Sequence, residues 1–197
     1  MRRAKPGSGS DLLAMREPSP GYIGGAIAPD LGGVAHAIVG GLATALYMPE
    51  RMTLDTDILV SAEDIEAAEA AMERAGCQKT GILTIGGGTW RMPGGRMVDL
   101  IALHSAWVSE AIATAVPGPG GHPHVRLPYL VLMKLESGRV QDLADISRML
   151  GGAGEAALAE VRDLVSRLRP EDREDLESLA QLGKLEQGGP ESGTAGG

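Results

Sequence analysis

The chain has 197 residues, enough for one domain with a substantial core and a helical extension. Its net charge of −8 and its few aromatic side chains, three Tyr, two Trp and no Phe, argue against a surface built mainly to bind nucleic acid. The single Cys excludes an intramolecular disulfide and a Cys-rich zinc site, and no apolar run approaches the roughly 18 residues of a membrane span, so we expect a cytoplasmic protein that contacts no membrane.

Composition divides the chain into four parts. Residues 1–10 are rich in Gly, Ser and basic side chains, and residues 186–197 are rich in Gly, Ser, Thr and Pro, so both ends are predicted to be disordered. Between them we expect a core at 11–126 and a helical portion at 127–185. A short helix at 11–16 precedes a stretch that several Pro and Gly residues interrupt.

The patterned part of the core is predicted to begin with a strand at 35–39, a helix at 41–48 and a second strand at 54–60. A glycine pair, Gly40 and Gly41, stands where the first strand meets the helix. The backbone N–H groups at such a helix start have no partner within the helix and can bind phosphate oxygens. This junction is therefore a candidate phosphate site.

Two carboxylates lie two residues apart on the second strand. Because successive side chains of a strand alternate between its faces, Asp55 and Asp57 point to the same side. Proteins usually hold Mg²⁺ by one or two carboxylates together with phosphate oxygens of the substrate. The pair therefore predicts a site for Mg²⁺, or Mn²⁺, beside the glycine pair.

The following elements are predicted to be scaffold. Ser61 followed by Asp64 is a capping-box pattern, and it predicts a helix at 62–75. Glycine-rich turns then separate three strands, at 81–85, 89–92 and 96–103.

Asp99 is a lone acid within the apolar third of these strands. A solvent-facing place on an edge strand would explain it, but charges are rarely left in buried strands unless they are paired or bound to metal. We favour a functional carboxylate. His122 and His124 flank Pro123 in a loop rich in Pro and Gly, and without another ligand at metal spacing we predict that both are solvated.

The second half is predicted to consist of helices. An almost wholly apolar helix opens at Leu127 and contains Lys134, which either reaches the surface along its stem or meets an anion. On the next helix Asp142 and Asp145 share a face within reach of Arg139, which an ordinary salt-bridge cluster would explain. The other helices are predicted at 141–150, 154–168 and 171–182.

Two groups of residues carry a resemblance to a known family: Gly40, Gly41, Arg51, Thr53, Asp55 and Asp57, then Lys134, Arg139 and Asp142. Their order resembles the signature of the nucleotidyltransferase superfamily, and most of all that of the AbiEii-like enzymes, the toxin halves of type IV toxin-antitoxin systems. The resemblance covers roughly residues 33–150. It departs at Gly41, where many members carry a Ser that touches the triphosphate.

The resemblance implies an α/β fold, with a mixed sheet flanked by helices and a C-terminal helical portion. It implies a Mg²⁺-dependent enzyme that moves a nucleoside monophosphate from a nucleoside triphosphate to an acceptor hydroxyl and releases pyrophosphate. Asp55, Asp57 and Asp99 would be the catalytic and metal-binding residues, with Asp99 assisting the acceptor hydroxyl. The nucleotide would contact Gly40, Gly41, Arg51, Thr53, Lys134 and Arg139, and Asp142 would orient the two basic side chains.

The acceptor is open between a small molecule, an RNA and a protein. The resemblance implies a toxin with an antitoxin protein as partner, whereas the acidic charge favours a small acceptor, as in antibiotic-modifying nucleotidyltransferases. Two other classes remain: a nucleotide-binding regulator whose chemistry has lapsed, and an interaction protein that uses its helical half. Release of pyrophosphate from labelled nucleoside triphosphate would identify the enzyme.

Overall fold

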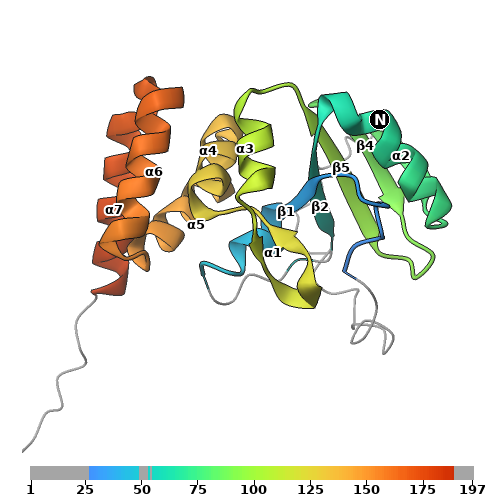
Figure 1. Cartoon of the computed structure of the whole chain (residues 1–197). Coiled ribbons are helices and arrows are strands. Elements are labelled where there is room, and N and C mark those ends of the chain that lie inside the picture. The colour runs from blue at the N-terminus through green and yellow to red at the C-terminus, as the bar shows by residue number, and fades with distance from the viewer. Residues whose placement is uncertain (1–26, 49–52, 54, 189–197) are drawn as a thin grey trace, which may run out of the picture.

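The computed structural model describes residues 27–48, 53 and 55–188 (Figure 1). The helix expected at 11–16, the disorder expected at 1–10, most of the expected 186–197 tail and the predicted nucleotide contact Arg51 lie outside these residues.

The described residues form a mixed sheet of seven strands in the order β3-β4-β5-β2-β1-β7-β6. The pairs β2–β5 and β1–β7 are parallel, and the other four are antiparallel. The strands are β1 His36–Val39, β2 Thr56–Ser61, β3 Gln78–Ile82, β4 Gly87–Arg91, β5 Met97–Leu103, β6 Val116–Pro117 and β7 Pro123–His124. The expected α/β fold with a mixed sheet, flanking helices and a C-terminal helical portion is confirmed.

Seven α-helices are described: α1 Gly40–Thr44, α2 Ile65–Arg74, α3 Trp107–Ala113, α4 Leu127–Ser137, α5 Val140–Gly151, α6 Glu155–Leu168 and α7 Arg173–Gln187. Short 3₁₀ segments are η2 Ala62–Asp64, η3 Pro119–Gly121 and η4 Pro170–Asp172. None of the helices in the described ranges is long and apolar enough to cross a membrane.

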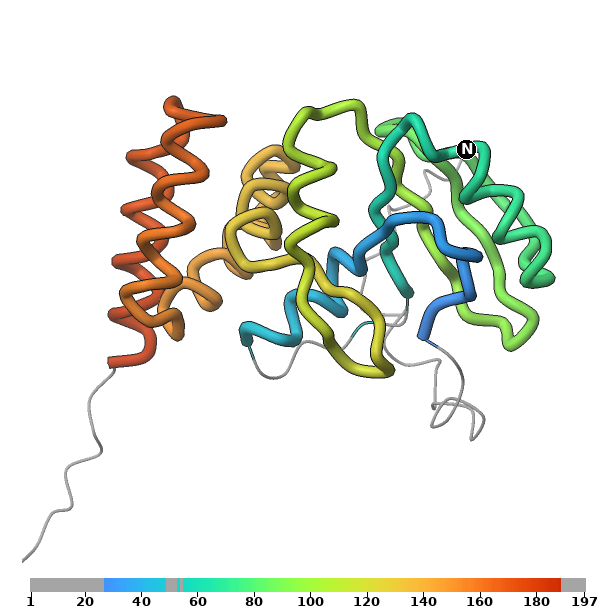
Figure 2. Tube along the Cα trace, viewed as in Figure 1, coloured from blue at the N-terminus to red at the C-terminus, as the bar shows by residue number. Residues whose placement is uncertain are grey.

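Side chains on the two faces of the central strands pack into two separate hydrophobic cores. On β2, Leu59 faces a cluster formed with α3 to α7, whereas Ile58 and Val60 face a cluster formed with α2. Figure 1 shows this layering, with α2 on one side of the sheet and α3 and α4 on the other. In Figure 2 the chain passes through α4 and α5 before it reaches the antiparallel pair α6 and α7 at the far end.

Several predicted elements are confirmed with shifted ends, and others were missed. The helix after the glycine pair ends at Thr44, β3 begins at Gln78 instead of residue 81, and α7 runs to Gln187. The sequence QKTGI of β3 is polar because β3 is an edge strand, so it lacks an apolar pattern. The missed elements are α3, β6 and β7.

One residue prediction is wrong. His124, expected to be solvated, is only 1% exposed. It lies on β7, which pairs with β1 opposite Ile38, and this pairing draws the histidine into the interior. A local reading of the Pro/Gly loop could not foresee the strand pairing.

Within the helical portion, α5 and α7 cross at close range. A Cβ on Gly183 would lie 1.9 Å from the Ser147 carbonyl oxygen, and one on Gly151 would lie 2.4 Å from the Gly183 oxygen. No real Cβ approaches backbone so closely. The two glycines therefore allow α7 to lie directly on the backbone of α5.

Candidate active site

The strand register brings two of the predicted carboxylates together. Asp57 on β2 and Asp99 on β5 are direct partners in the parallel pair, and both are half-buried. Partners in register project to the same face, here the face covered by α3 to α5. Asp55 is exposed just before β2, two residues from Asp57. The structure thus gathers Asp55, Asp57 and Asp99 at one end of the two strands.

The surroundings of Asp57 oppose its ionisation. Burial raises the pKa of Asp57 to about 6, and the charges of Asp99 and Asp55 add to the rise. A hydrogen bond from the Gly41 backbone N–H and the positive charge of Arg139 act in the opposite direction without cancelling it. The cluster therefore carries excess negative charge, which a bound cation would relieve.

The donor set fits a hard divalent cation that arrives with other ligands. Carboxylate oxygens are the ligands that Mg²⁺ and Mn²⁺ prefer. Within residues 27–48, 53 and 55–188, no three His, Cys, Asp or Glu side chains already surround a common point as a finished metal site. Phosphate oxygens of a nucleotide would supply the remaining ligands, which is the usual arrangement for Mg²⁺.

The glycine pair shapes the site. Gly40 has φ +58°, and a Cβ there would lie 1.9 Å from Oδ2 of Asp57. A Cβ on Gly41 would lie 2.7 Å from Cβ of Thr53, whose hydroxyl donates to the Asp55 carbonyl oxygen at 3.3 Å. Gly40 is therefore required for the close approach of the Asp57 side chain, and Gly41 for that of Thr53. The Gly41 N–H, which we expected to be free for phosphate, bonds to Asp57.

Lys134 lies in the interior between α4 and α5. Its side chain is 7% exposed, and its Nζ donates to Asp142 Oδ1 at 2.8 Å and to Asp145 Oδ2 at 2.7 Å. The alternative in which Lys134 reaches the surface is thereby excluded. Because its ammonium is paired with these two carboxylates, Lys134 holds Asp142 and Asp145 in place. Asp142 contacts both Lys134 and Arg139.

Arg139 belongs to the same network as Lys134, because it also contacts Asp142. Its Nε donates to Asp142 Oδ2 at 2.7 Å and to Ser137 Oγ at 2.8 Å, and its side chain is 78% exposed. Both contacts use Nε, so they leave the outer Nη groups of the guanidinium facing outward. The positive charge of Arg139 is one of the effects that lower the pKa of Asp57, against the larger effect of burial.

Opposing effects set the protonation of Asp142. Burial raises its pKa, but hydrogen bonds from Lys134, Ser137 and Arg139 lower it further than burial raises it. Asp142 therefore stays ionised and keeps both basic side chains in place. Sequence reasoning missed the part that Ser137 plays, because its hydroxyl reaches Asp142 only after Gly138, at φ +61°, reverses the chain between α4 and α5.

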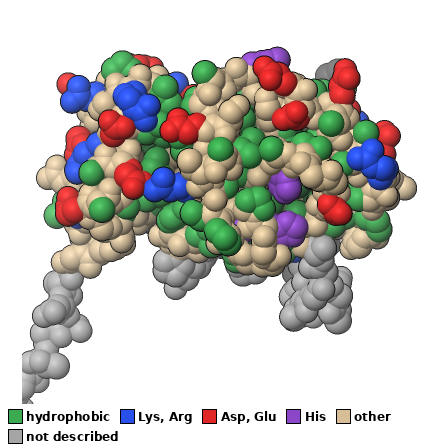
Figure 3. Space-filling model, in the orientation of Figure 1, with side chains coloured by type: hydrophobic (Ala, Val, Ile, Leu, Met, Phe, Trp, Pro, Cys, Tyr) green, Lys and Arg blue, Asp and Glu red, His purple; other side chains and the backbone are tan. Residues whose placement is uncertain are grey.

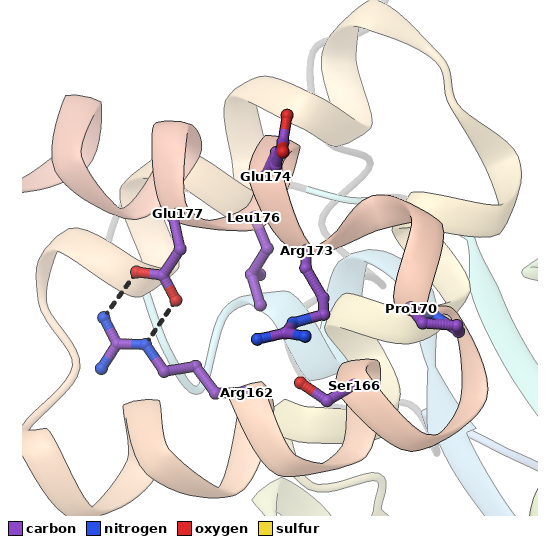
Figure 4. A pocket seen from close by; sticks show the side chains of 7 residues that line it. All are labelled: Arg162, Ser166, Pro170, Arg173, Glu174, Leu176 and Glu177. Atoms are coloured by element: carbon purple, nitrogen blue, oxygen red, sulfur yellow. Dashed lines mark hydrogen bonds and ion pairs between the residues drawn. The ribbon is translucent and has the colours of Figure 1, made fainter.

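A hollow lies away from the carboxylates. A cavity of about 590 Å³ opens between α6 and α7, and α4 and α5 separate it from the sheet (Figures 1 and 4). Across it Arg162 makes two hydrogen bonds to Glu177, of 2.6 Å and 2.8 Å. Because these charges neutralise each other, the hollow has none of the excess charge of the acid cluster.

Comparison with known proteins gives little beyond this geometry. No family model matches the sequence, and no curated protein matches it. The crystal structure of ANT(2")-Ia in complex with adenylyl-2"-tobramycin aligns with 78% of this chain and 89% of its own, at 19% identity and a TM-score of 0.42. The solution structure of the antibiotic-resistance factor ANT(2'')-Ia aligns with 78% and 86%, at the same identity and TM-score. These values are too low to assign a function to this chain.

Proposed function

We propose that the protein is a nucleotidyltransferase, which moves a nucleoside monophosphate from a nucleoside triphosphate to an acceptor hydroxyl. The observation that carries the proposal is the pairing of Asp57 with Asp99 on one face of the sheet, with Asp55 just before β2 and the pKa of Asp57 raised to about 6. Carboxylates with a raised pKa, such as Asp57, occur at functional sites more often than elsewhere. The family resemblance of the same residues supports the assignment.

The residues divide the work as follows. Asp55 and Asp57 would hold Mg²⁺ or Mn²⁺, and Asp99 would lie beside the metal. When bound, the metal supplies positive charge that stabilises the developing charge on the transferring phosphoryl group. Asp99 accepts the proton of the acceptor hydroxyl, whose oxygen forms the new bond to the α-phosphorus. The bond from the α-phosphorus to the bridging oxygen breaks, and pyrophosphate leaves with that electron pair.

Of the basic residues, Arg139 contacts the triphosphate directly and Lys134 acts indirectly. Arg139 contacts phosphate oxygens through its outward-facing Nη groups, since the guanidinium fork suits such oxygens. Lys134 and Asp142 are positioning residues, because they fix the direction in which Arg139 points. Gly40 leaves room for the side chain of Asp57, and Gly41 leaves room for that of Thr53, so the nucleotide would meet the backbone beside Asp57. Arg51 is proposed as a further nucleotide contact from the family pattern alone.

The acceptor is proposed to be a small molecule that carries hydroxyl groups. The net charge of −8 and the unneutralised carboxylates repel a polyanion and favour a neutral or cationic acceptor. The main alternative is a cytoplasmic toxin that modifies RNA or protein and is restrained by an antitoxin protein, which rests on the family resemblance.

The test is release of pyrophosphate from each of the four nucleoside triphosphates, with Mg²⁺ and a fractionated cell extract as source of acceptor. We expect release that depends on one fraction, with label transferred to a product of low molecular mass. Label on RNA or protein would favour the toxin alternative. Nucleotide binding without any release would identify a lapsed regulator, and release retained by Asp57→Asn would refute the site.

A further inference from the structure

The guanidinium of Arg139 is held by its Nε alone. Arginine commonly meets a carboxylate through two parallel N–H bonds, as Arg162 does when its Nε and Nη2 bind Glu177 (Figure 4). Figure 3 shows other Lys and Arg side chains beside Asp and Glu over α6 and α7. In Arg139 the single Nε hydrogen is shared between Asp142 Oδ2 at 2.7 Å and Ser137 Oγ at 2.8 Å. Its Nη groups make no hydrogen bond to a described residue.

Two other contacts of Asp142 account for this difference. Lys134 donates to Oδ1 at 2.8 Å between α4 and α5, where the side chain of Asp142 is only 9% exposed. The Ser137 hydroxyl donates to Oδ2 at 2.6 Å. A carboxylate oxygen has two lone pairs, so Oδ2 keeps one, and Nε of Arg139 uses it. The two-bond contact, which needs both oxygens, is thereby opposed.

The turn between α4 and α5 brings the serine to this place. Ser137 is the last residue of α4, Gly138 reverses the chain at φ +61°, and Arg139 directly precedes α5. The reversal turns the hydroxyl of Ser137 toward both Asp142 and the Nε of Arg139. Because Ser137 is exposed, its hydroxyl contributes little to the packing of the fold.

We propose that Ser137 is a positioning residue, which keeps Arg139 from closing on Asp142 and so leaves the Nη groups for the triphosphate. This inference rests on the proposed nucleotidyltransferase function. With the serine hydroxyl in place, both Nη groups can bind phosphate oxygens, which suit the arginine fork. Without it, we expect the guanidinium to turn and bind both oxygens of Asp142. The carboxylate would then compete with the triphosphate for Arg139.

The geometry can be tested without nucleotide or metal, by ¹⁵N NMR of the guanidinium groups of the full chain. The Arg139 signals are identified by their absence in Arg139→Gln. In the wild type the Nη groups should give one averaged signal, because nothing hinders their rotation about the Nε–Cζ bond. In Ser137→Ala, contact of one Nη with Asp142 should separate the signals, and Ser137→Thr, which keeps the hydroxyl, should resemble the wild type. Identical Nη signals in the wild type and Ser137→Ala would overturn the proposal.

The consequence for binding is tested by calorimetry with ATP, GTP, CTP and UTP, each with Mg²⁺. For the nucleotide that the wild type binds most tightly, Ser137→Ala should weaken binding by about 3- to 10-fold, the equivalent of one hydrogen bond. KM should rise by the same factor while kcat stays nearly unchanged. Ser137→Thr should restore the affinity. The matched control is Ser178→Ala, which removes an exposed hydroxyl from α7 and should leave binding unchanged.

A double-mutant cycle separates an indirect role from a direct one. If the serine acts through Arg139, Ser137→Ala should cause no further loss of affinity in the Arg139→Gln background. An equal loss in both backgrounds would overturn the proposal, because the hydroxyl would then contact the nucleotide itself. A lower melting temperature with unchanged affinity would also overturn it, since the hydroxyl would be only structural. A wild type that binds none of the four nucleotides would refute the proposed function, whereas the NMR comparison would still decide how Arg139 is held.

Discussion

Asp57 and Asp99 stand side by side as partners on the parallel strands β2 and β5, and the charge on Asp99 opposes ionisation of Asp57. The pKa of Asp57 is about 6 in the folded chain, against an ordinary value of 3.8. The folded state thus binds this proton more tightly than the unfolded state does. Its contribution to stability is complete below about pH 4 and is lost as the pH rises toward 6 and beyond.

The metal-free protein should therefore lose on the order of 2 kcal/mol of unfolding free energy from this group between about pH 4 and pH 7. Urea unfolding at a series of pH values, with a chelator present, measures the loss. Asp57→Asn should remove this part of the slope and be at least as stable as the wild type at pH 7. Asp163→Asn, at an exposed position on α6, should keep the wild-type slope. Equal slopes in the wild type and Asp57→Asn would contradict the assignment.

Divalent cations should stabilise the wild type, because they relieve the same repulsion. A tenfold excess of Mg²⁺ over its Kd adds about 1.4 kcal/mol, or a Tm increase of roughly 3–6 °C for a chain of this size. Nucleotide together with Mg²⁺ should raise Tm further. The Mg²⁺ response should be weaker at pH 5 than at pH 7.5, since Asp57 is mostly protonated below its pKa of about 6. A response in Asp57→Asn equal to that of the wild type would mean that Mg²⁺ acts elsewhere.

Asp99→Asn should separate binding from turnover. If Asp99 accepts the proton of the acceptor, the variant keeps most of its nucleotide affinity while kcat falls by about 10²–10⁴-fold. Nucleotide Kd from fluorescence and pyrophosphate release from the same preparation provide the comparison. Loss of affinity as large as the loss of kcat would assign Asp99 to the nucleotide-bound metal instead.

Lys134→Met should destabilise the fold strongly. We would expect a harmless change if Lys134 faced solvent or substrate, but it is the buried partner of both Asp142 and Asp145. Removal of one member of a buried ion-pair network costs about 3–5 kcal/mol. Neutralising both carboxylates in the same chain, with Asp142→Asn and Asp145→Asn, should restore part of the loss in urea unfolding. No recovery in the triple variant would argue against a charge-based cause.

Arg139→Gln should lower nucleotide affinity while leaving the stability of the fold almost unchanged. Its side chain is 78% exposed, so the fold should lose less than about 1 kcal/mol. Nucleotide affinity should fall by about 10- to 100-fold, as expected for lost hydrogen bonds to a charged group. The matched control is Arg167→Gln, which removes an exposed arginine from α6 and should leave affinity unchanged. An unchanged Kd in Arg139→Gln would remove this residue from the proposed site.

Elements with strong local patterns were predictable from the sequence. The apolar strands β2 and β5 and the helices α4 to α6 carry their periodicity in adjacent residues, and their positions are confirmed within a few residues. The elements β6 and β7 were not predictable, because each has two residues with a proline and forms only against a distant partner.

The site was predictable in its residue types and not in its contacts. Spacing predicted that Asp55 and Asp57 share one side of a strand, but β2 begins at Thr56 and leaves Asp55 just before it. The neighbourhood of Asp99 required the β2–β5 register. The pairing of Lys134 with Asp142 and Asp145 depends on the reversal at Gly138, which sets the angle between α4 and α5. The burial of His124 likewise depends on a strand pairing that no local pattern encodes.

Between β2 and its partner β5 the chain passes through α2 and the β3–β4 hairpin. During synthesis Asp57 leaves the ribosome well before Asp99 and ionises as an isolated carboxyl. The repulsion begins only when β5 docks, so closing the sheet at neutral pH brings two negative charges together. If a divalent cation binds here as proposed, its presence at that moment should favour docking, and we then expect completion of the fold to depend on the ionic composition of the surrounding medium.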